Sequence, residues 1–299
     1  MRKRGGEPTP GGFVVVDKPA GMTSHGVVAR VRRLAGTRRV GHGGTLDPMA
    51  TGVLIVAVER ATRLLTYVLG SRKRYTATIR LGQSTVTDDA EGDIIATADA
   101  SAVPESATRA GLAALTGEIQ QVPSAVSAIK VDGRRSYARV RAGEEVALPP
   151  RPVTVYRLDS LAFRRSPGLL DVDVDVECSS GTYIRALARD LGASLGVGGH
   201  LVALRRYAVG SFTLAEVSTL DELVDRPDPV TLPLSVAAAR LLPRREASAD
   251  EAKVLAHGGQ VSTVGIEGPY AVFDPDGAVV AVVRERDGLA RPETVLTSA

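Results

Sequence analysis

The chain has 299 residues, 44% of them apolar, which is enough for one large domain and a small one with filled cores. It has no apolar run near the ~20 residues of a membrane-spanning helix, and no apolar segment follows its basic start as in a signal peptide. The single cysteine, Cys178, excludes an intrachain disulfide and a multi-cysteine zinc site, and the four histidines form no metal-binding motif. We therefore expect a cytoplasmic globular protein that binds no metal and is not embedded in a membrane.

Positive charge is concentrated near the start of the chain. Residues 1–80 contain 15 Lys or Arg against 4 Asp or Glu, whereas residues 81–120 contain 1 against 7. Two arginine-rich clusters, at 30–39 and 72–80, flank a glycine-rich loop, as expected of a surface that meets phosphates. A merely solvated basic face is the alternative for either cluster alone, but the pair of clusters favours a nucleic-acid partner.

The first 81 residues predict strands and helices in alternation. Ser24 is a suitable N-cap for a helix that Gly36 closes, and the other face of this helix carries arginines. A second helix should end at Gly70. The predicted strands are Phe13 to Val16, Val53 to Val58 and Tyr75 to Leu81.

The middle of the chain changes character several times. Residues 84–94 are acidic and predict an exposed turn region, and a helix is expected from about 105 to 115. Residues 121–152 look like an excursion from the domain, with a strand near 125–131 and an Asp-Gly turn at 132–133. The pattern fits equally a mobile flap that grips RNA and a hairpin packed on the body.

The last third predicts a strand, a helix, a strand and then a separate module. Residues 170–178 alternate apolar and acidic side chains, which indicates one buried and one solvated strand face. A helix with an apolar stripe follows the turn at 179–182, and residues 198–209 form another strand. In the module at 246–299, Ser248 opens a helix with a capping box, and a hairpin turns at 274–277.

One carboxylate stands out by its surroundings. Asp47 lies in the segment VGHGGTLDPMATGVLIVAV at 40–58, where glycines permit close backbone approach and Pro48 stiffens the turn after the acid. The apolar strand that follows places this loop at the rim of a sheet. By itself the pattern also fits an ordinary surface Asp-Pro turn.

Four motifs, taken together and in this order, resemble the bacterial tRNA pseudouridine-55 synthases of the TruB family. They are DKPAGMTS at 17–24, GHGGTLDPMATG at 41–52, KRY at 73–75 and GTYIRALARDLG at 181–192. The resemblance extends over residues 12 to 212 and includes the 121–152 insertion and GHLVALRR at 199–206. Nothing in the Asp47 loop departs from the family pattern.

The resemblance implies an α/β (α+β) fold of three parts. A central mixed, largely antiparallel sheet flanked by helices would form a pseudouridine-synthase catalytic domain at 12–245, with an RNA-binding insertion at about 121–152. A flexible basic tail at 1–11 would precede it, and a small PUA-like domain at 246–299 would follow. The implied protein is a monomer that needs no cofactor.

The implied reaction is isomerisation of uridine 55 in the TΨC stem-loop of tRNA. Asp47 would be the essential carboxylate, either as a nucleophile on the sugar or as a base that removes a sugar proton; the sequence leaves both routes open. Arg185 resembles the cation that keeps this acid ionised, because an adjacent guanidinium favours the charged form. Tyr75 resembles the aromatic that stacks on the flipped base.

Further residues are assigned by the same resemblance to RNA binding. Tyr183 and Leu204 resemble base-pocket residues, and His42 resembles the residue that fills the place of the flipped base. Cations near these motifs are candidate phosphate contacts: Lys18, Arg72, Lys73, Arg74, Lys130 and Arg205.

Of three alternatives to this interpretation, the sequence leaves two open. A non-catalytic RNA-binding or RNA-folding protein could retain the same scaffold, although the intact set of Asp47, Tyr75 and Arg185 argues against it. A nucleotide-phosphate site at the glycine-rich loop lacks the required phosphate-loop context. An enzyme of the same chemistry could also act on another RNA uridine.

Overall fold

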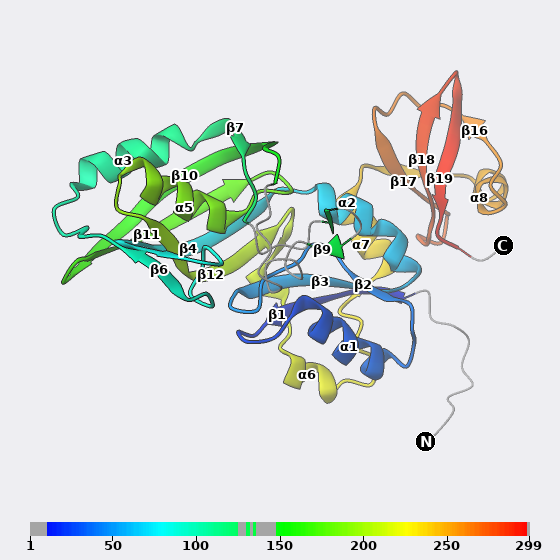
Figure 1. The fold of residues 1–299 in the computed structure, drawn as a ribbon. Coiled ribbons are helices and arrows are strands. Elements are labelled where there is room, and N and C mark those ends of the chain that lie inside the picture. Colours follow the sequence, from blue (N-terminus) through cyan, green and yellow to red (C-terminus); the bar gives the residue numbers. More distant parts are fainter. Residues whose placement is uncertain (1–10, 125–129, 132–133, 136–147, 298–299) are drawn as a thin grey trace. The chain divides into compact units, whose positions relative to one another are not determined.

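The computed structural model describes residues 11–124, 130–131, 134–135 and 148–297 (Figure 1). The predicted tail, the Asp-Gly turn at 132–133 and most of the strand expected near 125–131 lie outside these residues. The chain forms two compact units: the first comprises Met1–Pro48, Gly52–Gly70 and Gly210–Ala299, and the second comprises Met49–Thr51 and Ser71–Val209. The expected boundary between residues 245 and 246 stays a prediction.

The first unit is built on two long antiparallel strands. β1 (Gly11–Lys18) pairs with β3 (Thr51–Glu59) along its whole length, and residues 52–58 of β3 are all buried, as the apolar run predicts. β14 (Leu232–Pro233) pairs with β1, and the short strand β2 (Val40–His42) pairs with β3. The loop that carries Asp47 therefore leads into the buried strand β3.

Helices of the first unit follow the predicted pattern, with one correction. α1 (Ser24–Ala35) is capped by Thr23, whose hydroxyl accepts a hydrogen bond from the Gly26 N–H at 3.0 Å, so the predicted N-cap Ser24 was wrong by one residue. Gly36 closes the helix with a φ of 63°, as predicted. The other helices of this part are η1 (Arg60–Leu64), α2 (Leu65–Gly70), η2 (Leu214–Glu216), α6 (Leu220–Val224) and α7 (Leu234–Leu241).

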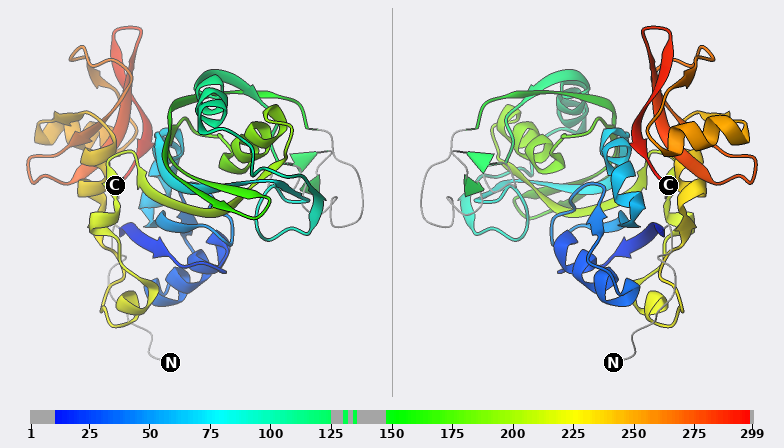
Figure 2. Two further views of the ribbon diagram at one scale, coloured as in Figure 1. Left: turned by 90° about the vertical axis from the view of Figure 1, so that its left-hand side faces the viewer. Right: turned by 90° about the vertical axis from the view of Figure 1, so that its right-hand side faces the viewer.

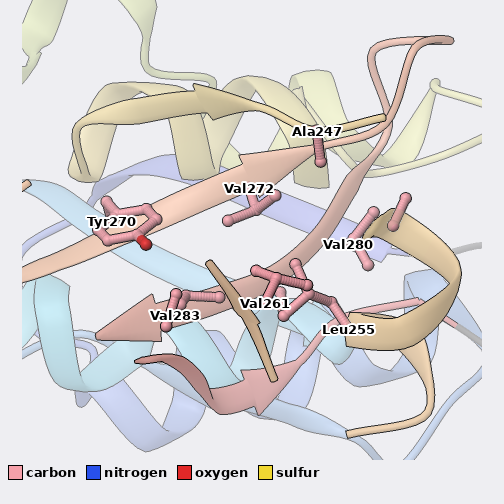
Figure 3. Close-up of a cluster of buried hydrophobic side chains, with 10 residues drawn as sticks. Ala247, Leu255, Val261, Tyr270, Val272, Val280 and Val283 are labelled. Carbon is pink, nitrogen blue, oxygen red and sulfur yellow. The ribbon is translucent and has the colours of Figure 1, made fainter. Parts of the chain in front are cut away.

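The C-terminal segment carries its own five-stranded sheet and core. The strand order is β15-β17-β18-β19-β16, and α8 (Ala249–Ala256) opens with the predicted capping box between Ser248 and Glu251. Figure 3 shows the buried side chains of this core, among them Leu255, Tyr270 and Val283. The strands are β15 (Arg244–Glu246), β16 (Val261–Ser262), β17 (Pro269–Phe273), β18 (Val279–Arg286) and β19 (Leu289–Val295).

The second unit is an antiparallel sheet with helices on one face (Figure 2). Its strands run in the order β12-β4-β11-β10-β7, and every neighbouring pair is antiparallel, with register shifts within the β10–β11 and β12–β4 pairings. The helices α3 (Glu105–Ala114) and α5 (Ile184–Ser194) pack against each other and the sheet. The strands are β4 (Lys73–Leu81), β7 (Gly117–Gln121), β10 (Arg151–Ser166), β11 (Leu169–Cys178) and β12 (Gly199–Val209). Two short strands, β8 (Lys130–Val131) and β9 (Arg134–Arg135), pair with each other, and β13 (Phe212–Thr213) follows β12 along the chain. The predicted α+β fold class is confirmed.

The region predicted as an exposed acidic turn is partly core. β5 (Gln83–Thr85) pairs with β6 (Ile94–Thr97), and between them Asp89 is only 2% exposed. The acidic face of β11 also differs from the solvated face that alternation predicts, because Asp171 and Asp175 form ion pairs with Arg80 at 2.7 Å and Arg157 at 2.8 Å. Short-range pattern could not reveal these partners from other strands.

Two kinds of feature are absent from the described residues. No helix there is both long and apolar enough to cross a membrane. No group of three or more His, Cys, Asp or Glu side chains within that part of the chain could hold a metal ion.

Close packing of α5 on the start of β12 gives a test of the fold. A Cβ at Gly192 would come within 2.2 Å of the backbone of Gly198 and Gly199, whereas a Cβ at Gly70 would meet nothing within 4 Å. We expect Gly192→Ala to lower the free energy of unfolding by about 2 to 4 kcal/mol through overpacking of rigid backbone, and Gly70→Ala to leave it within about 1 kcal/mol. Urea unfolding of both variants would measure this; equal stabilities would contradict the packing described.

Candidate active site

The loop that carries Asp47 is fixed on both sides of the carboxylate. Before it, the Ser24 hydroxyl accepts from the Leu46 N–H at 2.8 Å and donates to the Leu46 carbonyl at 2.9 Å. After it, the Pro48 carbonyl accepts from the Gly21 N–H at 2.8 Å. Ser24 and Gly21 belong to the motif that precedes α1, so two of the recognised motifs meet at this loop. A short loop held at both ends presents its carboxylate in a fixed place.

Lys18 contributes a third restraint from inside the protein. Its side chain is 0% exposed, and its ammonium donates to the carbonyls of Pro19 at 2.8 Å, Met22 at 2.6 Å and Pro48 at 3.0 Å. These three bonds use the donors of an ammonium group and offset the cost of burying its charge. The ammonium is thus turned to carbonyls of its own unit, and the phosphate contact of Lys18 stays a prediction.

Glycines allow the same loop to pack closely. The Gly43 N–H donates to the Ile55 carbonyl at 2.8 Å, and a Cβ at Gly43 would lie 2.3 Å from Val68. His42 precedes this glycine at the end of β2, opposite Val56, and is half-buried. The ring of His25 meets the His42 ring edge-on, with centroids 5.3 Å apart. His42 is thus held beside the Asp47 loop, as its place in the motif indicates.

In the second unit, Arg185 occupies a buried site near the start of α5. Its side chain is 5% exposed, and its Nη1 lies 3.3 Å from Asp89 Oδ2, a carboxylate that is itself 3% exposed. The same nitrogen donates to the Thr87 carbonyl at 2.7 Å. A buried guanidinium is costly unless paired, and here a carboxylate and a carbonyl supply the pairing.

Asp89 is a site residue that sequence reasoning missed. Its Oδ1 accepts hydrogen bonds from the Thr87 hydroxyl and from the Glu91 N–H at 3.0 Å, and its carbonyl accepts from the Thr85 hydroxyl at 2.7 Å. Residues 84–94 contain four acids with no periodic pattern, so no local signal marks this one as buried. Only its distant partner, Arg185, distinguishes it.

Tyr75 and Leu204 lie on one buried face of the sheet. Tyr75 is opposite Arg206, and Leu204 is opposite Ala77, in the pairing of β4 with β12. Because directly opposite residues share a face, Tyr75, Leu204 and Arg206 point to the same side. Their exposed fractions are 7%, 8% and 1%. Tyr183 lies at the N-cap of α5 and is half-buried. The second unit thus contains all the predicted base-contacting residues except His42.

Lys73, a predicted phosphate contact, begins β4 and is buried. It is 5% exposed, and its ammonium donates to the Ser71 carbonyl at 2.6 Å. Burial, and secondarily the charge of Arg206, lower the pKa of Lys73 to about 8. Burial likewise raises the pKa of the neighbouring Cys178 thiol to about 11. The phosphate contact of Lys73 likewise stays a prediction.

The other predicted phosphate contacts are more accessible. Arg72 is exposed; its guanidinium lies 3.8 Å from the Tyr156 ring centroid and 3.4 Å from Glu177. Arg74 is half-buried, with its guanidinium 5.4 Å from the Tyr207 ring centroid. Arg205 donates to the Thr51 hydroxyl at 3.2 Å. The side chain of Lys130 lies outside the described part of the chain, so its contact stays a prediction.

Solved structures of similar fold include complexes of Cbf5 and an H/ACA RNP. A Cbf5-Nop10-Gar1 complex superposes with a TM-score of 0.73 and 28% sequence identity, covering 96% of this chain and 85% of that chain. An H/ACA RNP bound to a substrate RNA containing 2'-deoxyuridine gives a TM-score of 0.70 at 27% identity, with 96% and 85% covered. The chain therefore has the fold of the pseudouridine synthases.

Sequence comparison narrows this class to one family. The model of the TruB family pseudouridylate synthase N-terminal domain matches residues 32–184, and two C-terminal models, of tRNA pseudouridylate synthase B and tRNA pseudouridine synthase II, match 185–228 and 242–297. Among relatives, tRNA pseudouridine synthase B of Arthrobacter sp. (strain FB24) is 57% identical over 95% of this chain and 96% of its own length. That of Thermobifida fusca (strain YX) is 56% identical, with 96% and 99% covered. The chain belongs to the TruB family of pseudouridine synthases.

The buried ammonium of Lys73 predicts a pH-dependent term in stability. Between pH 8 and the unfolded pKa of about 10.4, the unfolded chain binds the Lys73 proton and the folded chain releases it, so this group makes stability rise with pH. Lys73→Met lacks this term. We expect the stability of the wild type relative to Lys73→Met to increase by about 1 to 2 kcal/mol from pH 7 to pH 9.5, measured by urea unfolding. A constant difference would contradict the burial of this charge.

The Asp89–Arg185 pair predicts a loss of activity at a residue outside the recognised motifs. Asp89→Asn removes the negative charge that lies 3.3 Å from this buried guanidinium, and we expect pseudouridine formation to slow by about 10- to 100-fold while RNA binding changes little. Asp93→Asn, at an exposed acid of the same segment, is the matched control and should behave like the wild type. Single-turnover kinetics would measure both; an unimpaired Asp89→Asn variant would remove this carboxylate from the site.

Proposed function

We propose that this enzyme isomerises uridine 55 in the TΨC arm of tRNA to pseudouridine, with Asp47 as the essential carboxylate. The proposal rests on the joint presence of two features: the loop of Asp47 is held in place, and Arg185 is buried and paired. Each of these residues lies within a motif of the family. The relatives at 51–57% identity named tRNA pseudouridine synthase B support tRNA as the substrate.

The chemistry requires a bond exchange at the sugar. The bond from C1′ to N1 breaks, the uracil turns within the site, and C1′ bonds to C5; C5 then loses its proton and N1 gains one. Asp47 acts either by attacking C1′ or by removing a proton from the sugar, and both routes require an ionised carboxylate. A guanidinium such as that of Arg185 favours the ionised form of an acid beside it. We therefore assign Arg185 to electrostatic support of Asp47.

The base must leave its stack before C1′ can be reached. We assign Tyr75 to stacking on the flipped uracil, and Tyr183 and Leu204 to the walls of the base pocket. Tyr75 and Leu204 share a face of the sheet, which fits a common pocket. His42, held edge-on by His25, would occupy the space that the base vacates.

The remaining contacts follow from the charge distribution. We assign phosphate contacts of the TΨC stem-loop to Arg72, Arg74, Lys130 and Arg205, with further contacts from the insertion at 121–152. The chemistry calls for no cofactor or metal, and we propose a cytoplasmic monomer whose segment 246–299 is a PUA-like domain.

The direct test is an unmodified tRNA transcript incubated with the protein, followed by carbodiimide labelling and primer extension. The wild type should give one new stop in the TΨC arm, and Asp47→Asn should give none while binding tRNA within about tenfold of the wild type, since phosphate contacts supply most of the affinity. Joint loss of binding and activity in Asp47→Asn would contradict its catalytic role. A stop elsewhere would change the substrate and keep the chemistry.

A further inference from the structure

Gln121 is a buried polar residue to which the reaction described above gives no role. It is the last residue of β7, and its side chain is 2% exposed. Its amide makes two hydrogen bonds to the backbone of one residue, Tyr183: the Tyr183 N–H donates to Oε1 at 2.8 Å, and Nε2 donates to the Tyr183 carbonyl at 3.1 Å. The side-chain amide thus bonds both the backbone N–H and the backbone carbonyl of a single residue.

The residue that Gln121 bonds lies where α5 begins. Tyr183 is the N-cap, with an extended conformation and no side-chain capping hydrogen bond. The first N–H groups of a helix have no partner within the helix, so an outside group that satisfies one also fixes where the helix starts. Arg185 is only two residues farther along. The Gln121 amide therefore sets the position of both the pocket residue and the cation.

Gln121 is itself held in place by its strand and by a hydrogen bond to the residue next to it. Its backbone pairs with Arg151 in the ladder between β7 and β10. Its neighbour Val122 accepts a hydrogen bond from Arg189, one helical turn after Arg185, at 2.8 Å. Arg189 also lies 3.2 Å from Asp88, the residue next to the Asp89 that pairs with Arg185. Residues 121–122 and the turn at 88–89 thus hold the same helix at two successive turns.

We propose that Gln121 is a positioning residue for the isomerisation: its amide fixes the start of α5, so that Tyr183 and Arg185 are held in place for the reaction. The inference rests on the proposed function, because it assigns Gln121 to the geometry of residues that act there. It predicts that the amide matters more to the chemical step than to the capture of RNA, since Gln121 itself is buried and does not face the solvent.

Gln121→Met tests the proposal with a side chain of similar length that neither donates nor accepts these bonds. We expect the single-turnover rate of pseudouridine formation on a tRNA transcript to fall about tenfold, with the Kd for the same transcript within about threefold of the wild type. Gln120→Met, at the exposed preceding residue of β7, is the matched control and should keep the wild-type rate.

Gln121→Glu gives a readout that a general packing role would not change. The carboxyl group accepts from the Tyr183 N–H in either form, but it donates to the Tyr183 carbonyl only when protonated, and burial favours that form. We therefore expect the rate of this variant relative to the wild type to rise several-fold from pH 8 to pH 6. This comparison also decides the matter if Gln121→Met fails to fold.

The possible results test the positioning role of Gln121 and the proposed function separately. A wild-type rate in Gln121→Met, a parallel loss of rate and RNA affinity, or a pH-independent ratio for Gln121→Glu would overturn the positioning role. Absence of pseudouridine at position 55 with the wild-type protein would instead overturn the proposed function, whatever the variants do.

Discussion

The buried ion pair between Arg185 and Asp89 is the interaction on which the organisation of the second unit depends. Both side chains are almost fully covered, so each charge offsets part of the cost of burying the other. The pair explains why a polar, acidic segment folds inward between β5 and β6, and why its hydroxyl and backbone groups are used to satisfy one carboxylate. An enzyme gains from this cost because a cation held in one place needs little reorganisation when charge develops beside it.

In the first unit a different buried cation, Lys18, helps to fix a loop. The loop of Asp47 is rich in glycine and would be loose alone, yet Lys18 and Ser24 hold the residues on either side of the acid. Lys18 is bonded to three backbone carbonyls, whereas Arg185 is paired with one carboxylate and one carbonyl; in both units the buried cation and the segment that bonds it fix each other. In the first unit, the motifs at 17–24 and 41–52 therefore contain the Asp47 carboxylate together with side chains that hold its loop.

The sequence was most informative where burial follows a local period. The alternation of β11, the apolar run of β3 and the capping box at Ser248 all predicted the observed elements. It failed where a partner is distant in the chain: Lys18 bonds Pro48, 30 residues away, and Arg185 pairs with Asp89, which no pattern marks. The cap of α1 was misplaced by one residue because Thr23 and Ser24 are equally good caps, and only the bond of Ser24 to Leu46 decides between them.

In the proposed mechanism, Asp89 and Gln121 are separate supports of one geometry, that of Arg185 at the start of α5. The most direct measurement is a double-mutant cycle of Asp89→Asn and Gln121→Met on the single-turnover rate of pseudouridine formation. If both residues position Arg185, the second substitution should add little once the first has displaced it, so the combined loss should be clearly smaller than the product of the two single losses. A combined loss equal to that product would show that the two residues act independently and would contradict the account.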